Sequence, residues 1–188
     1  ALPGQRSYAE VPFGRTSEAA DTHDGLPWNG AASVEIPGTG FRISGGIDRL
    51  DLSGDSTTAR VRDYKTGRAP SKHIVLNGGR ELQRCLYGFA VRSLLGEVEI
   101  DAALVYPREG EMLKLQDPGT VLENLTAHLV MARDSLKQGR ALPGPDAADT
   151  YDDFAFALPA NAAKVYRKRK ADSVAALMGD AAAVWEAE

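Results

Sequence analysis

The stretches Gly46-Ile47-Asp48-Arg49-Leu50-Asp51 and Asp63-Tyr64-Lys65-Thr66-Gly67 decide the fold of this chain. Both alternate as strands do, with successive side chains on opposite faces of a sheet. Asp48 then shares a face with the leucines that follow it, and Asp63 shares a face with Lys65 and the apolar residues before it. An unpaired carboxylate on an apolar face is costly. Two carboxylates beside a lysine instead suit a hard cation such as Mg²⁺, which takes oxygen ligands, so the two strands predict a metal site.

A helix and a further strand are predicted downstream of these two strands. Apolar residues recur at helical spacing from residue 82 to residue 94. Gln83 and Tyr87 are four residues apart, hence neighbours on one flank of that helix. The segment 100–106 then has the composition of a strand. Each of the two aspartate-bearing segments, taken alone, could equally be an ordinary solvated strand. Tyr87, taken alone, could equally be a core aromatic residue with a polar tip. The order strand, strand, helix, strand is what favours a functional site.

In this order the chain resembles the PD-(D/E)XK nuclease superfamily, in particular its RecB-like branch. It is most similar to the C-terminal nuclease domain of AddB-type subunits of helicase–nuclease machines, which process DNA double-strand breaks. The resemblance implies an α/β fold with the restriction-endonuclease-like core, a small mixed central sheet flanked by helices. It is carried within about residues 41–106 by three motifs, Gly46-Ile47-Asp48-Arg49, Asp63-Tyr64-Lys65-Thr66-Gly67 and Gln83-Arg84-Cys85-Leu86-Tyr87.

The resemblance also implies roles for the motif residues. The two inward aspartates would bind Mg²⁺ or Mn²⁺, and the backbone carbonyl of Tyr64 would add a ligand. Lys65, a compact cation with three donors, would orient the attacking water or stabilise charge on the phosphorane. The glutamine and tyrosine of the third motif would hold the nucleic-acid backbone or brace Lys65. The implied catalytic residues are Asp48, Asp63, Lys65, Gln83 and Tyr87.

The chain departs from the family upstream of the first motif. RecB-like nucleases carry a His or Glu on a helix well before the first aspartate, but only 47 residues precede Asp48 here. They contain no convincing helix, so we expect the chain to be a fragment of a larger protein. His23 lies in a polar stretch typical of a loop and is interpreted as solvated, whereas Glu10 lies on a plausible strand as a weak candidate for a supporting acid.

A second departure concerns iron. Many AddB-type nucleases hold a [4Fe–4S] cluster through cysteines, but Asp149, Asp152 and Leu158 stand where those thiolates would be. The sole cysteine, Cys85, falls on the apolar stripe of the predicted helix. One thiol cannot hold a cluster that requires four ligands, so no iron–sulfur cluster is expected.

Composition predicts a single domain of 188 residues, with its motif-bearing core at about 41–106 and a C-terminal helical region at about 117–188. A hairpin is expected around the turn at 37–40, and helices are expected from 117 to about 138 and after Asn161. A single cysteine and the lack of an apolar run of about 20 residues favour a cytoplasmic protein without membrane contact.

The net charge of −4 is unevenly distributed. Residues 40–95 hold ten Lys or Arg against five Asp or Glu, which makes this segment locally basic. A positive face around a metal site can attract phosphate. The DNA contacts expected in this segment are Arg49, Arg68 and Arg84.

Taken together, the sequence predicts a metal-dependent deoxyribonuclease, with exonuclease action favoured over endonuclease action. The resemblance implies a helicase region in the same chain, a partner helicase–nuclease subunit and a role in recombinational repair. A stand-alone RecB-like exonuclease and a non-catalytic DNA-binding or scaffold module remain alternatives. The intact set of Asp48, Asp63 and Lys65 argues against the scaffold.

Overall fold

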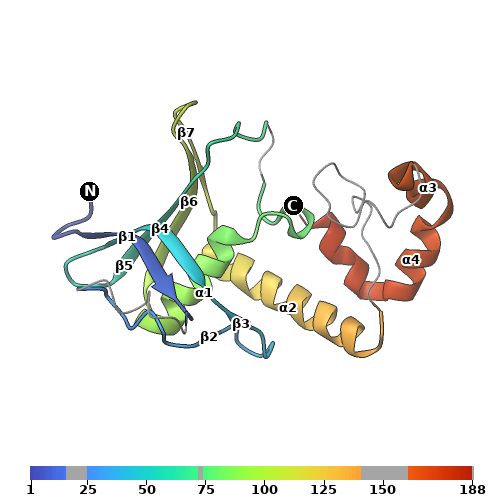
Figure 1. Cartoon of the computed structure of the whole chain (residues 1–188), viewed down its shortest axis with the longest axis horizontal. Helices are drawn as coiled ribbons and strands as arrows, with labels where there is room; N and C mark the ends of the chain where they lie inside the picture. The colour runs from blue at the N-terminus through green and yellow to red at the C-terminus, as the bar shows by residue number, and fades with distance from the viewer. Residues whose placement is uncertain (16–24, 72–73, 141–160, 188) are drawn as a thin grey trace.

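A computed structural model describes residues 1–15, 25–71, 74–140 and 161–187. Its centre is a five-stranded sheet with the spatial order β1-β4-β5-β6-β7 (Figure 1). Only β5 and β6 run parallel, and the other neighbours are antiparallel. The small mixed sheet predicted from the sequence is therefore confirmed. Its strands are β1 Arg6–Phe13, β4 Gly45–Leu52, β5 Thr58–Tyr64, β6 Glu99–Tyr106 and β7 Glu111–Lys114.

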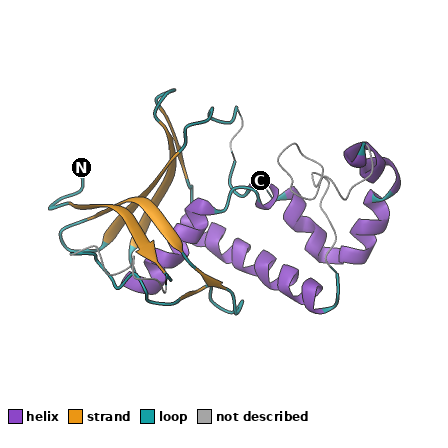
Figure 2. Cartoon of the chain, viewed as in Figure 1, coloured by secondary structure: helices purple, strands orange, loops and turns teal. Residues whose placement is uncertain are grey.

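Helices cover one side of this sheet (Figure 2). Helix α1 packs against β5 and β6, and α2 packs against α1. The C-terminal helices lie at the far end of α2, and the chain end returns to the loop before α1, where the Gly78 N–H donates to the Ala187 carbonyl at 2.7 Å. The helices are α1 Gln83–Leu95, α2 Pro118–Lys137, α3 Ala162–Arg169 and α4 Ala171–Met178, with short 3₁₀ turns η2 Asn77–Gly79 and η4 Gly179–Glu186.

The core lies between the sheet and α1. It combines leucines and valines of β4 and β5 with the apolar stripe of α1. Gly88 of α1 faces α2, and a Cβ there would make an ordinary van der Waals contact at 3.4 Å with a methyl group of Leu122. The fully buried members from the strands and α1 are Val11, Val34, Ile47, Leu50, Leu52, Ala59, Cys85, Ala90 and Val91.

Most of the expected elements are present with small shifts at their ends. The hairpin forms from β2 Val34–Glu35 and β3 Arg42–Ile43, which pair antiparallel. Asp117 caps α2 through its side chain, which accepts from the Thr120 N–H at 3.4 Å. The expected last helix instead breaks at Lys170 into α3 and α4. No helix in the described part of the chain is long and apolar enough to cross a membrane.

Candidate active site

The candidate site lies where β4 and β5 separate. The two strands pair from Leu52 and Ala59 as far as Arg49 and Arg62. Beyond that point the Tyr64 N–H donates to Oδ2 of Asp48 at 2.8 Å, a side-chain acceptor in place of a β4 carbonyl. A backbone N–H that has left the ladder needs another acceptor, and here the Asp48 carboxylate supplies it. Because a side chain of β4 accepts this hydrogen bond in place of a backbone carbonyl, the two strands can separate. The same bond brings Asp48 to the end of β5.

Asp63 is the buried acid of the site. It is only 3% exposed, and the Lys65 ammonium lies 2.7 Å from its Oδ2. The Tyr87 hydroxyl donates to its Oδ1 at 3.3 Å. The ammonium is at ion-pair distance but lacks hydrogen-bond alignment, so Oδ2 is buried without a hydrogen bond among the described residues. An ionised carboxylate has about four lone-pair sites, so Asp63 can accept a further cation beside the ammonium and the phenol.

Lys65 links β5 to α1. Its backbone N–H donates to the Val105 carbonyl at 2.8 Å, which extends the pairing with β6 just past the end of β5. Its ammonium also donates to the Gln83 side-chain carbonyl at the start of α1. The lysine side chain is 27% exposed, so its charge lies at the border between the buried acid and solvent. The arrangement brings Lys65, Asp63 and Gln83 together, as the motif order predicts.

Tyr87 reaches Asp63 from α1 and is held by an aromatic contact. The ring of Phe13 packs against it edge to face, with centroids 6.3 Å apart and planes at 82°. Burial raises the pKa of Tyr87 well above its ordinary value, and the nearby charges of Asp63 and Asp48 raise it further. The phenol therefore stays protonated and acts as a donor toward Asp63.

The donor set fits a small hard cation. Among the described residues no three His, Cys, Asp or Glu side chains gather as a metal cage. The carboxylates of Asp48 and Asp63 both offer oxygen ligands, and each oxygen has more than one lone pair, so a cation can bind beside the partners they already have. Mg²⁺ commonly binds through one or two carboxylates and keeps several waters, so a two-carboxylate site suits it.

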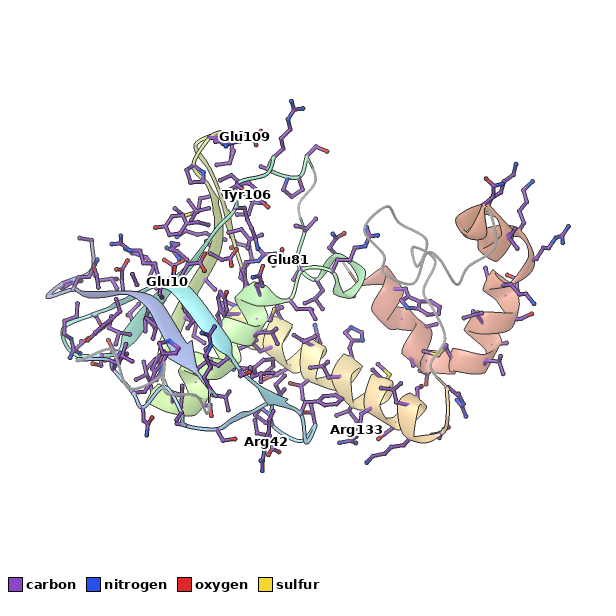
Figure 3. All side chains as sticks on the ribbon, in the orientation of Figure 1. Glu10, Arg42, Glu81, Tyr106, Glu109 and Arg133 are labelled. Carbon is purple, nitrogen blue, oxygen red and sulfur yellow. The ribbon has the colours of Figure 1, made fainter. Side chains whose placement is uncertain are left out.

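Two polar residues of this neighbourhood were not singled out by the sequence analysis. Glu81 precedes α1, and Tyr106 ends β6 (Figure 3). Burial raises the pKa of Glu81, while the nearby charges of Lys65 and Arg84 partly oppose this. Its Oε1 is buried without a hydrogen bond in the described structure. The one sequence signal for placing Glu81 near the site is its position two residues before Gln83. An acid just before a helix is ordinarily interpreted as a helix cap, so this signal does not by itself indicate a site.

A hollow of about 450 Å³ opens beside the site. Gln83 and Tyr87 of α1 form one wall, and Phe13 and the β3–β4 connection form the other. Gly45 lies against the Phe13 ring, where an added Cβ would come within 3.0 Å of it. The hollow offers space for a substrate group next to the buried carboxylate.

The three arginines expected to contact DNA differ in placement. Arg84 is 1% exposed and donates to the backbone carbonyls of Ile74, Val75 and Leu113. The expectation that Arg84 contacts DNA is therefore wrong, because its guanidinium is used to tie the segment before α1 to β7. Arg49 lies on the opposite sheet face from Asp48, and Arg68 is exposed in the loop after β5.

The supporting residues considered upstream have mixed outcomes. Glu10 is exposed on β1, between Ala9, which pairs with Arg49, and Val11, which pairs with Ile47. Its φ of 51° is left-handed, which is uncommon for a residue other than glycine. His23 and the 149–158 stretch compared with the iron–sulfur cysteines lie outside the described residues.

The family model described as PD-(D/E)XK nuclease superfamily matches residues 5–178 of this chain. The match includes β1, both aspartate-bearing strands, α1 and most of the C-terminal helices. No curated protein and no solved structure matches the chain at a significant level.

Proposed function

Because this chain belongs to the PD-(D/E)XK nuclease superfamily, we propose that it hydrolyses DNA phosphodiesters with the help of a divalent cation. The observation that carries the proposal is the buried Oδ2 of Asp63, which has a lysine ammonium 2.7 Å away and no hydrogen bond. Structural ion pairs are normally completed by hydrogen bonds. At Oδ2, the Asp63–Lys65 ion pair at the end of β5 lacks such a bond among the described residues. Its carboxylate could bind a cation, and its ammonium could bind a phosphate.

The residues divide the work by chemistry. Asp48 and Asp63, with the carbonyl of Tyr64, would hold Mg²⁺ or Mn²⁺. A divalent ion there supplies a Lewis acid and lowers the pKa of a bound water. Lys65 cannot bind a cation, so its ammonium is reserved for the phosphate oxygens or the attacking water. Gln83 holds that ammonium in place, and the Tyr87 hydroxyl orients Asp63.

The motif order also supports a proposal about the wider setting. The succession of Asp48, Asp63-Tyr64-Lys65 and Gln83-x-x-x-Tyr87 supports a RecB-like nuclease domain. We place it in a helicase–nuclease that processes DNA ends for recombinational repair, acting as an exonuclease beside a partner subunit. A stand-alone exonuclease would carry the same residues.

The test compares cleavage by wild type and Lys65→Ala. End-labelled linear DNA is incubated with Mg²⁺ or Mn²⁺, and Lys137→Ala on the exposed end of α2 serves as the matched control. Loss of one preorganised charge costs on the order of 10²–10³ in rate, so cleavage by Lys65→Ala should nearly vanish. Equal cleavage by both would place the active site elsewhere, and no cleavage by wild type under any divalent metal would favour a scaffold.

A further inference from the structure

The sheet has a second charged face, opposite the active site. Strand alternation puts Asp63 on the side packed by α1, so Arg60, Arg62 and Tyr64 of the same strand lie on the other side. Neighbouring strands add Arg49, Asp101 and Lys114 to this face. We call the set of Arg49, Arg60, Arg62, Tyr64 and Lys114 the basic sheet face.

The basic sheet face has more cations than its acids can neutralise. Asp101 alone receives Arg60 at 3.1 Å, Arg62 at 2.9 Å and Lys114 at 3.6 Å. Arg49 pairs with Asp51 at 3.1 Å, yet it also lies directly across from Arg62 in the β4–β5 register. Like charges placed opposite each other on a sheet are destabilising, and the Arg62 side chain is only 7% exposed. The excess charge is therefore held at a cost that an anion would relieve.

The basic sheet face also has a shape and an aromatic group. It lines a hollow of about 390 Å³, together with Asp51, Val105 and Met112. Tyr64 is 45% exposed, and Met112 beside it is similarly open. Both side chains line the hollow beside its cations. The hollow thus combines an exposed aromatic ring with cations.

We propose that the basic sheet face binds a single-stranded stretch of the DNA substrate, with phosphates at Arg60 and Lys114 and a base stacked on Tyr64. Proteins that hold single strands combine a positive groove with aromatic platforms, and such platforms are often built on open sheets. An acidic protein segment would use the cations but would have no need of the exposed ring.

The position of Tyr64 supports this route. It lies between Asp63 and Lys65 in the chain, so a strand that leaves the cleavage site passes around the end of β5 directly onto this face. Arg49, expected from the sequence to contact DNA, lies there too. The proposal rests on the proposed nuclease function and names how the substrate is held beyond the cleavage site.

The test measures fluorescence anisotropy of a labelled dT₂₀ oligonucleotide in EDTA, where no cleavage occurs. The double variant Arg60→Gln/Lys114→Gln should bind about tenfold or more weakly, and its slope of log affinity against log salt should be shallower by about 1.4. The control, Lys137→Gln/Lys168→Gln, removes two exposed lysines from α2 and α3 and should bind as wild type. Thermal unfolding verifies that each variant is folded.

A second pair of variants tests the ring. Tyr64→Leu should weaken dT₂₀ binding about fivefold or more, whereas Tyr64→Phe, which keeps the stacking surface, should bind as wild type. Unchanged binding by the double variant, or by Tyr64→Leu, overturns the proposal. Competition by polyglutamate at concentrations as low as those of unlabelled dT₂₀ also overturns it in favour of an acidic protein partner. Failure of the nuclease function would appear separately, as uncut DNA in Mg²⁺ with this binding intact.

Discussion

Replacing Lys65 by methionine should destabilise the metal-free protein by leaving a buried charge uncompensated. Methionine keeps the length of the side chain but removes the ammonium that lies 2.7 Å from Oδ2 of Asp63. The remaining polar contact of Asp63 in the described structure is the Tyr87 hydroxyl at 3.3 Å. That single neutral donor cannot replace a full positive charge.

The magnitude follows from the geometry. At 2.7 Å the gross attraction is about 6 kcal/mol at an effective dielectric constant near 20, and desolvation offsets much of it. Removing one partner of a fully buried pair costs roughly 3–5 kcal/mol. Because the Lys65 side chain is 27% exposed, water screens this pair, and we expect the free energy of unfolding to fall by about 1–3 kcal/mol.

Urea unfolding at neutral pH in EDTA measures this fall in the free energy of unfolding. Lys137→Met is the control for removing an exposed lysine. Repeating the titration in Mn²⁺ should narrow the difference between wild type and Lys65→Met, because a cation at Asp63 compensates the same charge. The double variant Asp63→Asn/Lys65→Met should recover stability in EDTA. Equal unfolding midpoints in EDTA, or a difference that Mn²⁺ leaves unchanged, would refute the reasoning.

Three further predictions concern single groups. Asp63→Asn should lower Mn²⁺ affinity in calorimetric titration by about 100-fold or more, since even replacing a residue that only hydrogen-bonds to a metal ligand costs about 10–100-fold; unchanged affinity would remove Asp63 from the ligand set. Burial raises the pKa of the Cys85 thiol to about 11, so its alkylation by iodoacetamide at pH 8 should be slower than that of a free thiol by on the order of 10²-fold, and rapid labelling of the folded protein would contradict this. The raised pKa of Glu81 means that its stabilising contribution is present at low pH and is lost as pH rises through the folded-state value. Glu81→Gln should therefore increase the free energy of unfolding by roughly 1 kcal/mol at pH 7.5 and leave it unchanged below about pH 4; a decrease at pH 7.5 would show that the ionised form is stabilised.

The strands and helix of the site could be predicted because their patterns are local. Period-two alternation placed Asp63 and Lys65 on one face of β5 and Tyr64 on the other, and the register agrees. Four-residue spacing placed Gln83 and Tyr87 on one flank of α1, where they reach Lys65 and Asp63. Both inferences need only the spacing of residues in the sequence and the regular geometry of a strand or a helix.

The misplaced residues depend on contacts made far along the chain. Arginine is usually exposed, but Arg84 is buried. The backbone carbonyls of Ile74, Val75 and Leu113 accept hydrogen bonds from its guanidinium. β7 was not predicted, since its four residues gain strand geometry only by pairing with β6. The burial of Arg62 likewise requires Asp101, which is 39 residues away. No local pattern in the sequence encodes such pairings.

Where β4 and β5 separate, Tyr64 takes part in both faces of the sheet. Had the ladder continued past Arg49 and Arg62, the Tyr64 N–H would have bonded to β4 and closed the gap beside Asp63. Its bond to Asp48 instead fixes the first acid without using the lysine. The same residue carries an exposed ring on the other face. Tyr64 therefore links the basic sheet face to both acids of the cleavage site, to Asp48 of β4 through its N–H and to Asp63 as its neighbour in β5.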